Sequence, residues 1–202
     1  MKNIIFTIVT FILLFSLSTH ANEWKLISTQ DNINIYSTSS KNGVIPFKAS
    51  STLDIPLNEV LDILTDYKSK NKWAPKLDYV KMHKKLGENT FIFSEYYKTP
   101  WPATDREFLL KGSVIQTSSR SYELRAHSIK DPLLRSEDHI QADVKFINLK
   151  LKSISEYKTS IHFEFHGDMK GWMPLWLMNL IQKKWPMRFI QGLKKYNSGQ
   201  LR

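Results

Sequence analysis

Hydrophobic and polar residues alternate over much of the chain with the two-residue period of a β-strand that is buried on one face. Near the start, Ile33 and Ile35 stand between polar neighbours, and residues 43–55 repeat this pattern. The intervening Lys41-Asn42-Gly43 is rich in turn formers, so we expect a hairpin there. Strand-like patterns return later in six segments, at residues 78–86, 90–98, 106–116, 121–129, 138–154 and 159–169.

Two segments change to the 3.6-residue period of a helix. The first begins at Pro56, a residue that suits the first turn of a helix, and ends near Asp66. The second occupies the last thirty or so residues. Strands in series between two helices predict an α+β domain in which helices cover one side of an antiparallel sheet.

The last helix carries more apolar surface than packing against one sheet requires. One stripe steps by three or four residues through Met178, Ile181, Trp185, Phe189, Leu193 and Tyr196. A second stripe comprises Met173, Trp176, Leu177 and Leu180, and residues 172–181 contain no charge. A helix that is apolar all round must be covered all round, so we expect a ligand, loop, partner or membrane on its second face. Pro186 is expected to kink or hinge this helix.

The N-terminus has the pattern of a secretory signal peptide. Lys2 precedes an uncharged apolar run from Ile4 to Leu17, and Thr19-His20-Ala21 is a small-x-small cleavage pattern. We expect cleavage after Ala21 and an exported protein, in a periplasm or outside the cell, with one domain over residues 22–202. An uncleaved anchor is the alternative, although the run is short for a membrane span.

Composition narrows the chemistry of the remaining chain. The sequence has no cysteine, which excludes disulfides, cysteine metal ligands and a cysteine nucleophile. After cleavage it would hold 28 basic and 19 acidic residues, a net charge of +9, because only Lys2 is lost. In an exported protein such a balance suits anionic membranes or acidic ligands at least as well as nucleic acid, although a solvated basic surface is an equally simple explanation.

Three motifs resemble the START domain family of lipid-transfer proteins, related to the steroidogenic acute regulatory protein. Trp73-Ala74-Pro75 follows the first internal helix, and Pro100-Trp101-Pro102 with Asp105-Arg106-Glu107-Phe108 follows a later hairpin. Gly171, Pro174 and Asn179 match the family's Gly-x-x-Pro-x-x-x-x-Asn start of the last helix in register. The resemblance covers essentially residues 22–196, and it is specific because all three motifs come in the family's order.

The resemblance implies a helix-grip fold of the Bet v 1-like superfamily. In that fold a curved antiparallel sheet wraps around a long C-terminal helix and encloses an apolar cavity. It also implies that Asp105, Arg106 and Glu107 are structural and that Asp105, Glu107 or a nearby carbonyl holds Arg106. Trp101 is expected to plug the turn between two strands.

One departure from the family concerns the polar pair that several sterol-binding members carry inside the cavity. Their arginine would fall at Gly112, or at Lys111 if the register slips by one. Glu95 is the candidate acid, but its arginine partner is missing. Because burying an unpaired carboxylate is costly, we expect Glu95 to face solvent.

Strand parity and the helix stripes together predict the cavity lining. The predicted ligand-binding residues are Trp73, Phe93, Phe108, Val114, Phe146, Phe163, Phe165, Trp176 and Leu180. A bulge in any strand would reverse this parity. The predicted membrane-contacting lid comprises Trp172, Met173 and Leu177 beside Lys183 and Lys184.

The expected function is non-enzymatic binding or transfer of an apolar lipid, such as a phospholipid, fatty acid or sterol-like molecule, by a monomer with transient anionic membrane contact. No cofactor, metal or nucleic acid is expected. His162 and His166 alternate with Glu164, but positions i and i+4 of a strand lie about 13 Å apart, too far to share a zinc ion. His127 and His139 near Asp131 and Asp138 fit solvated turns better than an acid–base pair.

Two other functions stay open. One is a helix-grip enzyme, such as a polyketide cyclase or aromatase, with Glu95, Arg106 or Tyr96 as its titratable group. The other is an envelope interaction module whose groove holds a partner helix.

Overall fold

A computed structural model describes residues 24–38 and 44–201. The predicted signal peptide and the predicted turn at residues 41–43 lie outside these residues. The elements in chain order are β1 (Lys25–Gln30), β2 (Ile33–Ser37), β3 (Val44–Leu53), α1 (Leu57–Thr65), α2 (Lys70–Trp73), β4 (Leu77–Gly87), β5 (Thr90–Tyr97), β6 (Arg106–Ser118), β7 (Ser121–Ser128), β8 (Ile140–Gln141), β9 (Asp143–Ser155), β10 (Lys158–Asp168) and α3 (Leu175–Asn197).

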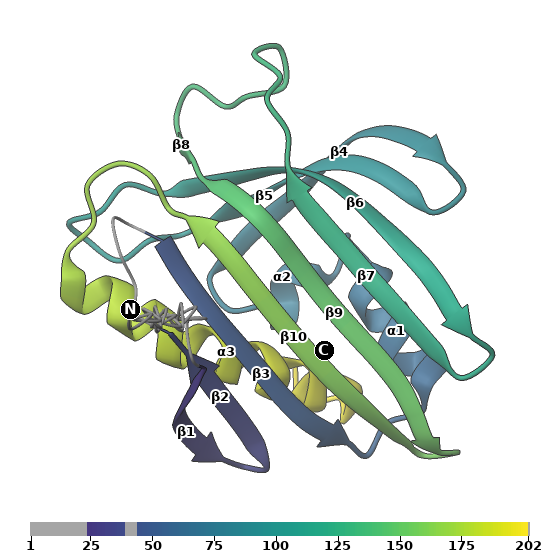
Figure 1. Cartoon of the computed structure of the whole chain (residues 1–202). Coiled ribbons are helices and arrows are strands. Elements are labelled where there is room, and N and C mark those ends of the chain that lie inside the picture. Colours follow the sequence, from purple (N-terminus) through teal and green to yellow (C-terminus); the bar gives the residue numbers. More distant parts are fainter. Residues whose placement is uncertain (1–23, 39–43, 202) are drawn as a thin grey trace, which may run out of the picture.

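The strands form one open sheet in the order β1-β2-β3-β10-β9-β7-β6-β5-β4, and the short β8 pairs with β6. All pairs along the main path are antiparallel. The pairing of β3 with β10 joins the beginning of the chain to its end, as the adjacent blue and green strands in Figure 1 show. The hairpins predicted around residues 87–89, 117–120 and 155–158 are confirmed.

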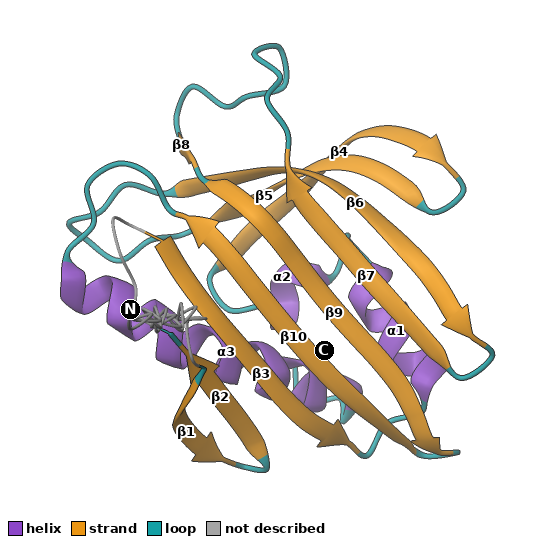
Figure 2. Ribbon diagram, in the orientation of Figure 1, coloured by secondary structure: helices purple, strands orange, loops and turns teal. Residues whose placement is uncertain are grey.

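All three helices lie on one face of the sheet, as Figure 2 shows. The helix α1 turns Val60 and Leu64 inward, which is the stripe that its 3.6-residue period predicts. The long α3 begins after Pro174, continues through Pro186 and packs against β2, β3, α1 and α2. The predicted α+β helix-grip fold is confirmed, whereas a hinge at Pro186 stays a prediction.

Close contact between α2 and α3 fixes where the long helix lies. A Cβ atom on Gly192 would stand 2.2 Å from the carbonyl oxygen of Trp73, so only glycine permits this approach. The Trp73 ring packs edge-on against Phe189, with 5.1 Å between ring centroids. The first α3 stripe is confirmed as a core stripe, because all six of its residues are buried or pack against the core. Within the described residues, no helix is long and apolar enough to cross a membrane.

Candidate ligand-binding cavity

An inner cavity of about 610 Å³ lies between the concave face of the sheet and the helices α1 and α3. A volume of this size falls within the range of small-molecule sites. Four predicted residues line it: Phe93, Phe108, Val114 and Phe163. The remaining walls are mostly apolar and include Leu61, Leu64, Val80, Met82, Leu110, Tyr122, Leu124, Ala126, Ile147, Leu149 and Phe189.

A second, smaller cavity of about 100 Å³ lies beside the first half of α3, and we call it the vestibule. The predicted residues Phe165 and Leu180 line the vestibule rather than the inner cavity. Tyr97, Phe108 and Trp185 line both cavities and form an aromatic wall between them. Ring centroids lie 4.8 Å apart between Tyr97 and Phe108, and 6.0 Å apart between Tyr97 and Trp185.

Three predicted lining residues lie elsewhere. Trp73 is buried in the contact between α2 and α3 and borders neither cavity. Trp176 points to solvent with 57 % of its surface exposed. Phe146 packs edge-on against His166 on the outer face, because a bulge between β9 and β10 at this point reverses the strand parity. Beyond the bulge, Ile147 and Leu149 line the cavity instead.

The prediction that Glu95 faces solvent is wrong. Its side chain is buried and lines the inner cavity, where one carboxylate oxygen pairs with the ammonium of Lys70 from α2. The other oxygen accepts a hydrogen bond of 2.6 Å from the Tyr97 hydroxyl. Burial, with the adjacent Glu95 carboxylate, raises the pKa of Tyr97 well above its usual value, so the hydroxyl keeps its proton. The cavity therefore holds a Lys70–Glu95–Tyr97 cluster with no net charge, because the ammonium balances the carboxylate.

The register of the strands explains why no arginine partners Glu95. Of the two positions at which the resemblance places the family's arginine, Gly112 and Lys111, Gly112 borders the inner cavity. A Cβ atom there would stand 2.8 Å from Cε1 of Phe93. The Phe93 ring thus occupies the space above β6 in which a longer side chain would have to fit, and the cation comes from α2 instead.

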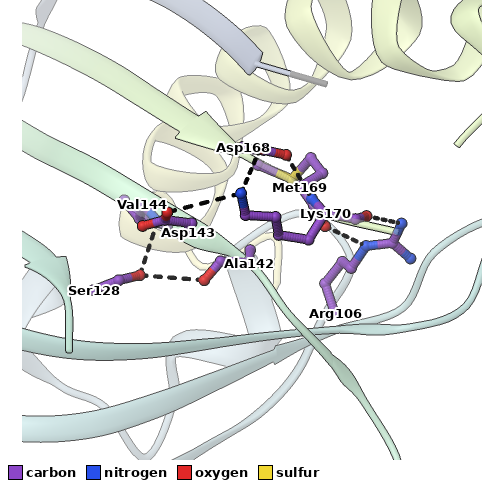
Figure 3. A network of polar contacts seen from close by, with 8 residues as sticks. All are labelled: Arg106, Ser128, Ala142, Asp143, Val144, Asp168, Met169 and Lys170. Atoms are coloured by element: carbon purple, nitrogen blue, oxygen red, sulfur yellow. Dashed lines mark hydrogen bonds and ion pairs between the residues drawn. The ribbon is translucent and has the colours of Figure 1, made fainter. Parts of the chain in front are cut away.

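Arg106 is buried beneath the loop that leads into α3, as predicted for a structural residue. Its Nε donates to the Met169 carbonyl at 2.8 Å and its Nη2 to the Lys170 carbonyl at 2.9 Å (Figure 3). Nη1 donates to the Thr104 carbonyl, and Nη2 also reaches the Trp172 carbonyl at 3.4 Å. Burial lowers the pKa of Arg106, but a guanidinium stays charged in proteins. Carbonyls hold Arg106, as one of the predicted alternatives has it.

The acids beside Arg106 have separate structural partners. Asp105 accepts a hydrogen bond from the Thr99 amide at 2.7 Å and pairs with Lys98 at 3.2 Å. Glu107 is fully buried and accepts hydrogen bonds from the Ser94 hydroxyl at 2.8 Å and the Ser136 amide at 2.9 Å. Both carboxylates therefore fasten loops to the sheet, which is the structural role predicted for them.

The predicted plug role of Trp101 is wrong. Trp101 lies between β5 and β6 with 89 % of its surface exposed, so it covers nothing within the described residues. A cis peptide bond joins it to Pro102. The two prolines at positions 100 and 102 explain why the backbone leaves the sheet here, since proline cannot donate to a strand ladder.

The predicted lid residues divide between surface and interior. Trp172 is 66 % exposed, and Lys183 and Lys184 are also exposed. Met173 is half-buried against the vestibule, whereas Leu177 is fully buried and lines it. Leu177 therefore belongs to the cavity wall, and the prediction that it contacts a membrane is wrong.

The alternating His162, Glu164 and His166 face outward, opposite the buried Ile161, Phe163 and Phe165, as predicted. Glu164 pairs with Lys48 of the adjacent strand at 3.3 Å. Across the part of the chain that the structure describes, no three His, Asp or Glu side chains are placed to share a metal ion.

Sequence reasoning missed Lys70 and Tyr97 as cavity residues. Lys70 begins a helix of only four residues, which leaves no periodic pattern to detect. Tyr97 ends β5, where strand parity assigns it to the same face as Glu95 and Phe93. Its position next to Glu95 was therefore available from the sequence, but the expectation that Glu95 faces solvent concealed it.

The family model of the START domain matches residues 13–196. The chain belongs to the START domain family. A protein of unassigned function from Pseudomonas aeruginosa is 25 % identical over 183 residues, covering 86 % of each chain. This START domain is also similar in fold to human StAR-related lipid transfer protein 5, with a TM-score of 0.79 at 14 % identity, over 92 % of this chain and 90 % of that one.

A bacterial structure, the STAR-related lipid transfer protein from Xanthomonas axonopodis, gives a TM-score of 0.74 at 16 % identity, covering 86 % of this START domain and 97 % of that protein. A Streptomyces aromatase/cyclase, Zhui, also shares the fold, with a TM-score of 0.53 at 8 % identity, over 79 % and 96 % of the two chains. Identities this low show a common fold only. They leave the choice between binding and catalysis to the site itself.

Proposed function

We propose that this START domain is an exported lipid-binding protein that holds the hydrocarbon part of a lipid in the inner cavity. The observation that carries the proposal is the cavity of about 610 Å³ with apolar walls on both the sheet and the helix side. Each buried methylene stabilises the complex by about 0.8 kcal/mol, so a cavity that fits a chain is sufficient for tight binding.

The Lys70–Glu95–Tyr97 cluster supports an uncharged polar group in the part of the ligand that lies beside it in the inner cavity. The cluster is neutral, so a charged group beside it would leave one charge uncompensated. The hydrogen bond to Glu95 uses one of the three ammonium hydrogens of Lys70, and the Tyr97 oxygen can still accept a hydrogen bond. A hydroxyl or an ester carbonyl of the lipid would complete this hydrogen bonding.

We further propose that loading takes place on an anionic membrane that contacts the first turns of α3. Trp172, Leu175 and Trp176 are all more than half exposed, and the exposed Lys183 and Lys184 follow on the same helix. Exposed tryptophans next to lysines suit the boundary between headgroups and acyl chains. The exposed Trp101 adds a further aromatic side chain in the loop whose Thr99 and Pro100 line the vestibule together with α3.

Native extraction tests the lipid-binding proposal. The full chain is expressed in a lipid-rich host, purified from the exported fraction and extracted with organic solvent, and the extract is examined by mass spectrometry beside a delipidated sample. We expect one lipid class in stoichiometric amount. The proposal would be contradicted if the protein is purified without bound lipid and then takes up neither fluorescent lipid nor fluorescent sterol.

A cavity-blocking variant locates the bound lipid. Ala126 lines the inner cavity from β7, so Ala126→Trp should fill it and abolish lipid recovery. His127 is exposed on the opposite face of the same strand, which makes His127→Trp the matched control. Equal loss in both variants would point to misfolding, and full recovery in Ala126→Trp would place the lipid outside the inner cavity.

One observation favours the alternative of a helix-grip enzyme. Tyr97 and Glu95 are titratable groups in hydrogen-bonding contact inside an apolar cavity, which is the kind of arrangement that acid–base chemistry on a hydrophobic substrate requires. Turnover of aromatic polyketide-like substrates distinguishes the two functions. Product formation that Tyr97→Phe abolishes, without loss of substrate binding, would favour the enzyme.

A further inference from the structure

The vestibule has a different electrostatic character from the inner cavity. Five cationic side chains and no acid line the vestibule: Lys76, Lys98, Arg106, Lys184 and Arg188. The inner cavity is lined by two cationic side chains, Lys70 and Arg125, and two acids, Asp62 and Glu95. The positive charge therefore gathers at one end of the site, while the other end is balanced.

Most of the vestibule cations have no carboxylate partner in the described residues. Lys98 pairs with Asp78 and Asp105, but no ion pair forms at Lys76, Lys184 or Arg188. Lys184 and Arg188 lie one turn apart on α3, an arrangement of like charges that weakens a helix. Helix stability therefore does not explain these two residues.

Arg106 provides a second and independent observation. Only 2 % of its surface is exposed, and its hydrogen-bond partners are four main-chain carbonyls. Figure 3 shows two of them, those of Met169 and Lys170. These carbonyls satisfy its donors but supply no full negative charge, and buried charges are normally paired. The Asp105 carboxylate next to it in sequence favours the charged form of Arg106, but it is also bound to Lys98 and to the Thr99 amide. A buried cation thus borders the vestibule and shares its nearest carboxylate with Lys98.

We infer that the vestibule is a binding site for an oxyanion, the phosphate or carboxylate headgroup of an anionic lipid whose chain lies in the inner cavity. The inference rests on the proposed lipid-binding function. Its volume of about 100 Å³ holds a headgroup but no acyl chain, whereas the inner cavity is chain-sized. Lys76, Lys184 and Arg188 donate to the oxyanion, and the buried charge of Arg106 attracts it. Because the rings of the aromatic wall are in contact, with centroids 4.8 and 6.0 Å apart, they must separate for a chain to join the two cavities.

Calorimetric titration with short-chain lipids tests this assignment. Dioctanoyl phosphatidic acid should bind more tightly than dioctanoyl phosphatidylcholine, and added salt should weaken the preference. Lys184→Gln/Arg188→Gln removes two of the donors and should lower the affinity for phosphatidic acid about tenfold. Lys152→Gln/Lys195→Gln removes the same charge at exposed positions that line neither cavity, and it should change the affinity by less than about twofold.

Each outcome bears on the site in a definite way. Equal losses in the two double variants would overturn it, because the effect would then be general surface electrostatics. Unchanged affinity in Lys184→Gln/Arg188→Gln would also overturn it. Inorganic phosphate that binds the wild type as tightly as phosphatidic acid, with the same loss in the variant, would support the oxyanion site but assign it to free phosphate.

Uptake of a neutral fluorescent diacylglycerol separates this inference from the proposed function. If Lys184→Gln/Arg188→Gln still takes up the neutral lipid while losing phosphatidic acid, both stand. If neutral uptake persists and no anion preference exists in the wild type, the vestibule site fails and lipid binding survives. If the wild type takes up neither lipid, both the vestibule site and the proposed lipid-binding function fail.

Discussion

Removing the ammonium of Lys70 would leave the Glu95 carboxylate buried beside the inner cavity without a cation. Only 3 % of the Glu95 side chain and 19 % of the Lys70 side chain are exposed. Among the described residues, the Tyr97 hydroxyl would then be the only group that donates a hydrogen bond to the carboxylate. The substitution Lys70→Met preserves most of the side-chain length and removes the charge, so it isolates the ion pair from packing.

The structure sets the size of this effect. Breaking a buried ion pair by removing one partner costs about 3–5 kcal/mol. Lys70 keeps some exposure and the cavity leaves room for water beside Glu95, so we expect about 2–3 kcal/mol of lost unfolding free energy. For a domain of this length that corresponds to a fall in Tm of about 5–10 °C.

Thermal and urea unfolding followed by circular dichroism measure this loss. Lys72→Met is the matched control, because Lys72 lies two residues further on in the same short helix and is exposed. The double variant Lys70→Met/Glu95→Leu replaces the pair with apolar groups and should recover most of the stability. If Lys70→Met and Lys72→Met have the same Tm and the same unfolding free energy, the Lys70–Glu95 ion pair does not stabilise the fold and the argument is refuted.

Three further predictions concern other parts of the fold. Gly192→Ala should lower the unfolding free energy by about 2 kcal/mol or more, because the new Cβ would collide with the Trp73 carbonyl. Gly87 has open space around it, so the control Gly87→Ala should leave the unfolding free energy nearly unchanged. Equal effects of the two substitutions in urea unfolding would contradict this prediction. Trp172→Ala/Trp176→Ala should reduce sedimentation with anionic liposomes about tenfold, while Tyr157→Ala, also exposed, should leave it unchanged; unaltered binding would remove the docking proposal. Burial, with Lys81 nearby, lowers the pKa of His83 below its ordinary 6.5. Because the unfolded chain then binds a proton more readily than the folded protein, the folded protein should lose stability as the pH falls from about 6.5 through the reduced pKa. His83→Gln should flatten that part of the stability–pH curve, and an unchanged curve would exclude the effect.

The sequence by itself determined the helix-grip fold and much of the apolar lining. Strand alternation is a local property, so Phe93, Phe108, Val114 and Phe163 could be assigned to the concave face before any tertiary contact was known. The motifs around Arg106 and Pro174 added the family and hence the topology. The same local rule failed at Phe146, because a bulge depends on how two strands pair and not on either strand alone.

Only the tertiary structure decided the polar and electrostatic features of the site. Lys70 reaches Glu95 across 25 positions of the sequence, and the buried carboxylate is tolerable only because that cation arrives from another element. The vestibule likewise gathers Lys76, Arg106, Lys184 and Arg188 from three separate segments of the chain. Periodicity shows which face of an element is buried. Charge compensation depends instead on the distances between elements, and those distances are set only when the sheet and α3 pack together.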